Sequence, residues 1–89
     1  MIERSYKITS VEGLHARPAA TLVAAVTPFT SEVKLEYQER QVNMKSIMGL
    51  MSLGISKDST IKIIADGSDE EDLMAVVDAL MKTEGLATG

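Results

Sequence analysis

The sequence predicts an α+β domain in which helices cover one face of a mostly antiparallel, four-stranded sheet. Its length of 89 residues is enough for one small hydrophobic core and too short for a second, so residues 1–89 are expected to form a single domain. Segments with an apolar period of two, typical of strands, alternate with segments of helical period. The resulting order is β-α-β-β-α-β-α, and a sheet with its helices on one face is the economical way to bury these apolar stripes.

The first strand and the first helix are predicted in the N-terminal third of the chain. Residues 2–8 place their three apolar side chains on one side at period two. A helix then begins near His15, with Pro18 in its first turn, where proline is tolerated. Its apolar stripe consists of Ala19, Leu22, Val23 and Val26. The helix is expected to end at Thr27, because the residue before a proline is disfavoured in the α region.

A hairpin and a short helix are predicted next. Residues 32–37 alternate apolar and polar side chains, and a tight connection leads to a short strand around residues 41–43. The connection contains neither glycine nor asparagine, so its turn type stays open. Ser46 then precedes the apolar segment 47–53, which Gly54 is expected to end as a helix C′ residue.

The last strand and the last helix complete the predicted domain. Residues 60–65 form the strand, and a turn follows it. Ser68 and Glu71 have the spacing of a capping box, which places the start of the helix at Ser68. The apolar stripe of this helix consists of Leu73, Val76, Val77, Leu80 and Met81. Gly85 is expected to end it.

Composition excludes several classes of function. Cysteine is absent and His15 is the only histidine, so neither a thiolate nor a multi-histidine metal site fits within one chain, and no cofactor is expected. A formal charge of −4 with only two tyrosines and one phenylalanine argues against direct nucleic-acid binding. The charged N-terminus lacks a signal-peptide pattern, and the longest near-apolar stretch, 19–26, is too short to insert across a membrane. A cytoplasmic protein is therefore expected.

The first candidate for chemistry is His15, at the predicted start of the first helix. The free N–H groups of Ala16 and its successors, together with the helix dipole, favour an anion at this position. The same positive potential favours the neutral imidazole, which is the nucleophilic form. Arg17 can offer its guanidinium group to a phosphate. These groups could accept and briefly hold a phosphoryl group, although the spacing alone also fits an ordinary solvated histidine, which is the commoner case.

Two further candidates lie in the segment 46–53. On a helix, Leu50 and Leu53 point in one direction, while three other apolar side chains cluster on the opposite side. This second side consists of Ile47, Met48 and Met51. Either the helix is buried on both sides, or the methionine side is exposed as an adaptable surface for several partners. Ser46 is a good N-cap; phosphorylation there would place about −1.5 to −2 charges at the helix N-terminus.

Two long segments, GLHARPAA at 13–20 and VNMKSIMGLMSLG at 42–54, contain these candidate residues. They match the two signature segments of the HPr family, which the sequence resembles over essentially its whole length. The family consists of the histidine-containing phosphocarriers of the bacterial phosphoenolpyruvate-dependent sugar phosphotransferase system. The resemblance implies an open-faced β-sandwich, βαββαβα, with three helices on one face of a four-stranded sheet. The physical logic of a relay fits a carrier better than a turnover enzyme, and a monomer is the natural expectation for such a shuttle, although the sequence leaves the oligomeric state open.

The resemblance gives each candidate residue a role. His15 would receive a phosphoryl group on Nδ1 from phospho-Enzyme I and pass it to the IIA domain of a sugar permease. Ala16 and Arg17 would steady that phosphate, and Pro18 would fix the helix start. Ser46 would be phosphorylated by the HPr kinase/phosphorylase of low-GC Gram-positive bacteria. The phosphoserine form would then bind the catabolite control protein CcpA and act in carbon catabolite repression.

The resemblance also implies a shared docking patch for these partners, and it leaves alternatives. The patch would consist of Ile47, Met48 and Met51. The related Crh proteins keep the Ser46 region but lack the phosphorylatable histidine, so a purely regulatory protein with an unused His15 is one alternative. A small-molecule-sensing α+β domain is another. In one departure from the family, no lysine or arginine occurs between Arg17 and Lys34, which predicts weaker electrostatic steering toward Enzyme I.

Overall fold

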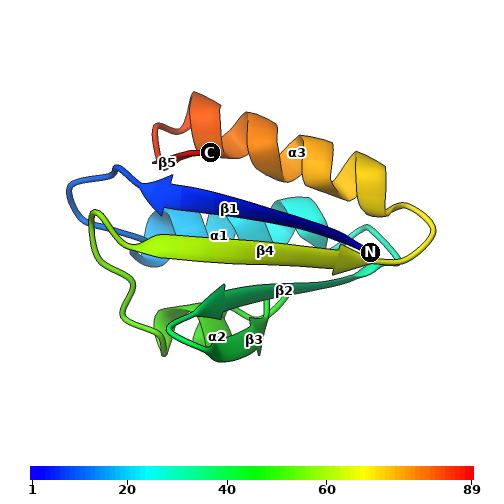
Figure 1. The fold of residues 1–89 in the computed structure, drawn as a ribbon, viewed down its shortest axis with the longest axis horizontal. Helices are drawn as coiled ribbons and strands as arrows, with labels where there is room; N and C mark the ends of the chain where they lie inside the picture. The colour runs from blue at the N-terminus through cyan, green and yellow to red at the C-terminus, as the bar shows by residue number, and fades with distance from the viewer.

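Five antiparallel strands form one sheet in the spatial order β3-β2-β4-β1-β5 (Figure 1). The computed structural model describes residues 1–89. The strands are β1 (Ile2–Ile8), β2 (Glu32–Tyr37), β3 (Arg40–Asn43), β4 (Thr60–Asp66) and β5 (Ala87–Thr88). The helices are α1 (Ala16–Val26), α2 (Ile47–Met51) and α3 (Glu70–Thr83). The α+β class and the order of the predicted elements are confirmed.

The prediction of a four-stranded sheet is wrong by one strand. β5 contains two residues, and in it Ala87 pairs with Ile8 and Thr88 pairs with Lys7. A two-residue strand is too short to show an apolar period of two, so the sequence pattern carries no signal for it. This pairing holds the C-terminal residues beside β1.

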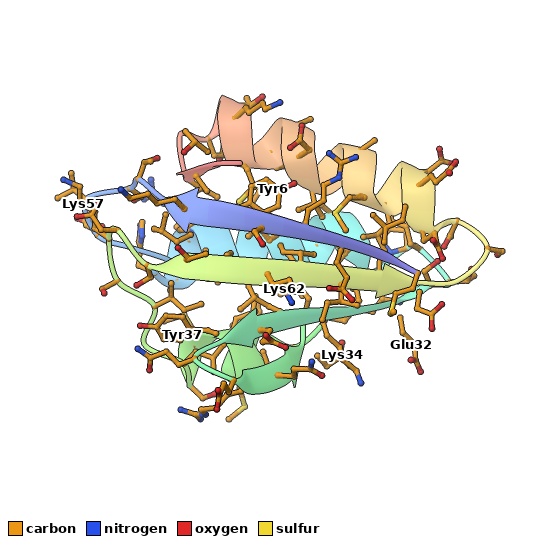
Figure 2. All side chains as sticks on the ribbon, in the orientation of Figure 1. Tyr6, Glu32, Lys34, Tyr37, Lys57 and Lys62 are labelled. Atoms are coloured by element: carbon orange, nitrogen blue, oxygen red, sulfur yellow. The ribbon has the colours of Figure 1, made fainter.

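The sheet has one buried face and one open face. In Figure 1, α1 and α2 lie behind the sheet and α3 runs along its upper edge. The core contains 21 buried apolar side chains, which come from every helix and from every strand except β3. Along β4, Ile61 and Ile63 are fully buried, whereas Lys62 between them is partly exposed. Figure 2 shows Lys62 on the open face, with Glu32 and Lys34 extending from β2 toward solvent. None of the three helices combines the length and apolar composition needed to cross a membrane.

The capping box predicted for the last helix is wrong. The N-cap of α3 is Asp69, not Ser68, and the helix starts at Glu70. The carboxylate of Glu70 accepts a hydrogen bond from the backbone N–H of Gly67 at 3.0 Å, so Glu70 closes the turn before the helix in place of Glu71. The acidic first turn of α3 still lies where the helix dipole stabilises negative charge.

Asp69 is used to hold a distant loop rather than to cap its own helix. Its two carboxylate oxygens accept hydrogen bonds from the backbone N–H groups of Thr30 and Ser31, each at 2.9 Å. The hydroxyl of Ser31 donates a further bond to the same carboxylate. This hydroxyl bond and the backbone bond from Thr30 lower the pKa of Asp69 to about 2. The contact fixes the loop between α1 and β2 against the start of α3.

A second long-range contact joins β1 to α3. Tyr6 is 2% exposed, and its hydroxyl donates to Oδ1 of Asp78 at 3.0 Å; Figure 2 shows Tyr6 between the two elements. Burial, reinforced by this bond to the carboxylate, raises the pKa of Tyr6 to about 12. Lys82 Nζ lies 2.9 Å from Oδ2 of Asp78, and its bond lowers the pKa of that carboxyl group. Tyr6 therefore links the buried face of the sheet to an ion pair on the helix.

The hairpin turn between β2 and β3 has two residues, Gln38 and Glu39. Their φ angles are 50° and 66°, and the flanking residues Tyr37 and Arg40 pair with each other. Two positive φ values are the signature of a type I′ turn, whose twist matches that of a hairpin. The turn type could not be predicted because the glycine or asparagine that normally marks this conformation is absent.

Candidate functional site

The loop before α1 is held against the segment after α2, and this contact positions His15. Gly13 has a φ of +68°, and a Cβ atom there would overlap the carbonyl oxygen of Ile55 and lie 2.8 Å from Cα of Ser56. The backbone N–H of the next residue, Leu14, donates to the same Ile55 carbonyl at 3.1 Å. Only glycine fits this approach of two backbones, so Gly13 fixes where the following histidine stands.

His15 is the N-cap residue of α1, as predicted, but its side chain does not cap the helix. Its side chain is 42% exposed, and Nε2 lies 3.3 Å from a carboxylate oxygen of Glu12. Nδ1 lies 3.4 Å from the carbonyl oxygen of Gly13, too far for a strong hydrogen bond. In the tautomer with its proton on Nε2, that proton points to Glu12 and Nδ1 keeps its lone pair. In that tautomer Nδ1 is the ring nitrogen that can act as a nucleophile.

The first turn of α1 presents unpaired hydrogen-bond donors beside the imidazole. The first backbone bond of the helix runs from the N–H of Ala19 to the carbonyl of His15 at 3.1 Å, while the N–H groups of Ala16 and Arg17 have no backbone acceptor. Pro18 has no N–H to satisfy, so it fits the first turn without cost. Arg17 is exposed and its guanidinium group forms no ion pair. Two free N–H groups and one unpaired cation therefore belong to the first turn of α1, next to His15, where a helix favours an anion.

A surface depression of about 230 Å³ adjoins these groups. Its lining residues come from the start of α1, the end of β1 and the C-terminal segment. They are Ser10, His15, Arg17, Pro18, Glu84 and Leu86. Ser10, Glu84 and Leu86 were not predicted, and the last two lie 69 and 71 residues after His15 in the sequence. A backbone hydrogen bond of 2.8 Å from Thr9 N–H to the Leu86 carbonyl holds the C-terminal segment beside the loop that leads to His15.

Ser46 is the N-cap of α2, as predicted. Its Oγ accepts a hydrogen bond from the N–H of Gly49 at 3.0 Å, and its carbonyl accepts one from Leu50 N–H at 3.1 Å. The neighbouring Lys45 donates from Nζ to the carbonyl of Phe29 at 2.6 Å. Ser46 is only partly buried, so its hydroxyl combines a capping role with access from solvent.

The two sides of α2 differ in exposure, which agrees with the alternative in which the methionine side faces solvent. Leu50 is 1% exposed and Leu53 is 6% exposed, so this side belongs to the core. The opposite side carries Ile47 (43% exposed), Met48 (84%) and Met51 (41%). We call these three residues the α2 patch. An exposed apolar cluster of this kind is a candidate docking surface, and it lies outside the depression beside His15.

A depression of similar size, about 220 Å³, lies on the open face of the sheet. Most of its lining side chains are polar or charged, and none is a histidine. They are Met1, Glu3, Glu32, Lys34, Gln41, Ile64 and Asp66. This depression does not adjoin the start of a helix, so His15 stays the candidate for phosphoryl chemistry.

Comparison with known proteins places the chain in a family. The family model described as "PTS HPr component phosphorylation site" matches residues 2–83. The chain therefore belongs to the HPr family, whose members are phosphocarrier proteins of the phosphotransferase system rather than turnover enzymes.

Solved structures agree with this membership. The histidine-containing phosphocarrier protein of Mycoplasma is 35% identical, with a TM-score of 0.95, and the match covers 99% of this chain and all (100%) of that one. HPr from Thermoanaerobacter tengcongensis is 40% identical, with a TM-score of 0.89 and 94% of each chain covered. Crh, the catabolite repression HPr of Bacillus subtilis, is 40% identical with a TM-score of 0.61, over 89% of this chain and 94% of that one.

Proposed function

We propose that this protein carries phosphoryl groups on His15 Nδ1, accepting them from phospho-Enzyme I and passing them to IIA domains of sugar permeases. The lone pair of Nδ1 attacks phosphorus, the bond from phosphorus to the donor protein breaks, and transfer to the IIA domain repeats the exchange in the opposite sense. The observation that carries the proposal is the position of a partly exposed imidazole at the N-cap of α1, with Nε2 beside Glu12 and only a long 3.4 Å contact from Nδ1 to the Gly13 carbonyl.

The surrounding groups suit a phosphate that must leave again. The free N–H groups of Ala16 and Arg17, and the unpaired guanidinium of Arg17, can each donate to phosphate oxygens. These donors are open to solvent on one side, so water weakens their hold relative to a buried site. A carrier needs this balance, because a phosphoryl group bound too firmly would not move on to the next protein.

We further propose that the α2 patch docks the protein partners and that phosphorylation at Ser46 regulates the docking. An ATP-dependent kinase of the HPr kinase/phosphorylase type would modify Ser46, and the modified form would act in catabolite control through CcpA. Phosphate on Oγ would sit directly beside Ile47 and place negative charge next to the patch. Partners with acidic surfaces would then be repelled, so regulation and phosphoryl transfer oppose each other. Transfer from Enzyme I to a Ser46→Asp variant should be slowed most at low ionic strength, and a wild-type rate at all salt concentrations would refute this link.

A regulatory protein that never uses His15 is the second candidate, because Crh of Bacillus subtilis is among the similar structures. The two candidates differ in one experiment. The chain is incubated with phosphoenolpyruvate, Mg²⁺ and active Enzyme I, and its intact mass is measured before and after acid treatment. The carrier gains one acid-labile phosphoryl group, and the His15→Ala variant gains none. Absence of labelling on the wild-type chain, with Enzyme I active on another carrier, supports the Crh-like candidate instead.

We propose a monomer as the working form, because a shuttle must present the same face to successive partners. Dimeric forms of HPr from Thermoanaerobacter tengcongensis and of Crh are known among the similar structures, so the state of this chain needs its own measurement. Light scattering at micromolar concentration should give the mass of a single chain, and a stable dimer would refute the proposal.

A further inference from the structure

The six methionines of the chain fall into two sharply different environments. Three of them are at most 2% exposed in the core: Met44, Met74 and Met81. Met1 is exposed at the N-terminus. The remaining two, Met48 and Met51, lie together on α2 with 84% and 41% of their surface exposed. The exposed thioethers outside the N-terminus are thus confined to the α2 patch.

We propose that Met48 and Met51 form a reversible oxidation site, at which a peroxide converts both thioethers to sulfoxides and thereby weakens docking of protein partners. The inference rests on the proposed docking role of the α2 patch. In each reaction the sulfur lone pair attacks one peroxide oxygen and the O–O bond breaks. The sulfur is oxidised by two electrons, and the departing oxygen leaves as water from hydrogen peroxide. A methionine sulfoxide reductase reverses the change, forming a disulfide from two thiols and releasing water.

Exposure makes the reaction selective for Met48 and Met51 over the core methionines. A peroxide must reach the sulfur atom, and Met48 and Met51 are open to solvent whereas the core methionines are closed to it. The chain has no cysteine, so no thiol competes with the thioethers for the oxidant. The fold tolerates the modification, because α2 is anchored in the core through Leu50 and Leu53 rather than through its methionines.

A sulfoxide changes what the α2 patch can bind. Thioether side chains are apolar and flexible, so they adapt to different partner surfaces. A sulfoxide oxygen accepts hydrogen bonds from water and loses them when a dry interface forms over it. Burying one sulfoxide oxygen without a hydrogen-bond partner should raise the dissociation constant for a partner about tenfold or more. The chemistry at His15 is untouched, since neither methionine lines the depression beside it.

The test uses the full chain, hydrogen peroxide and the Enzyme I transfer reaction. Peptide mass mapping follows which methionines gain one oxygen, and initial rates give KM and kcat for the chain as phosphoryl acceptor. Met48 and Met51 should be oxidised well before the three core methionines. KM should then rise about tenfold while kcat changes little, and treatment with methionine sulfoxide reductase and a dithiol should restore the original KM.

The matched control is the double variant Met48→Leu/Met51→Leu, which keeps Met1 and the core methionines. It is compared only with its own untreated form, and peroxide should not raise its KM. The inference is overturned if wild-type chain carrying both sulfoxides keeps its KM, or if peroxide raises the KM of the double variant equally. Failure of the untreated wild-type chain to accept any phosphoryl group is a different result, because it overturns the proposed function itself.

Discussion

Replacing Gly13 by alanine should cost more stability than the same change at Gly54 or Gly85, two other glycines with positive φ. The left-handed conformation at φ +68° costs an alanine about 1–2 kcal/mol. The new Cβ would also overlap the Ile55 carbonyl, forcing the two backbones apart and weakening the bond from Leu14 N–H, which contributes about 1 kcal/mol. The free energy of unfolding should therefore fall by about 2–3 kcal/mol in Gly13→Ala.

Gly54 and Gly85 provide matched controls for this change. Their φ angles are +61° and +62°, and a Cβ atom at either position meets nothing within 4 Å. Gly54→Ala and Gly85→Ala should lose only the conformational part, about 1–2 kcal/mol. Urea unfolding followed by circular dichroism measures all three variants. Equal losses in the three would refute the claim that the close approach of Gly13 to Ile55 holds the loop before His15.

Three further predictions concern other contacts. Tyr6→Phe should lower the free energy of unfolding by about 1–2 kcal/mol, because the Asp78 carboxylate loses its buried donor; an unchanged urea midpoint would contradict this. The pKa of Asp69 is lowered from 3.8 to about 2, so its contribution to stability is complete above about pH 4 and is lost as the pH falls toward 2. Urea titrations between pH 5 and pH 2 should show a shallower dependence in Asp69→Asn than in wild type. Ser46→Ala should lose the cap to Gly49 at a cost of about 0.5–2 kcal/mol yet still accept phosphate from Enzyme I, as thermal unfolding and intact mass can establish.

Much of the fold could be predicted from the sequence because its signals are local. The apolar stripe of α1 and the glycine after α3 are properties of neighbouring residues, and the structure agrees with both. The helix α1 also ends before Thr27 as expected, but the stated reason is wrong, because Thr27 keeps α-helical angles before Pro28. Burial of Leu50 opposite an exposed Met48 also follows from helical spacing once one side must face solvent.

The features that escaped prediction depend on contacts between distant parts of the chain. The Asp69 carboxylate accepts hydrogen bonds from backbone N–H groups 38 and 39 residues away. A local capping pattern therefore cannot predict which groups this side chain binds. β5 exists because the end of β1 offers a free edge, which a two-residue pattern cannot signal. Glu84 and Leu86 reach the depression beside His15 through the same pairing. Long-range placement of this kind is visible only in the folded chain.

The central claim is that Nδ1 of His15 is the phosphoryl-carrying atom, and nitrogen-15 NMR of the phosphorylated chain tests it most directly. Long-range proton–nitrogen correlations distinguish phosphate on Nδ1 from phosphate on Nε2. We expect phosphorus bonded to Nδ1, because Nε2 faces the Glu12 carboxylate at 3.3 Å and Nδ1 does not share that contact. Phosphate on Nε2, or an unchanged His15 ring after incubation with phosphoenolpyruvate and Enzyme I, would contradict the account.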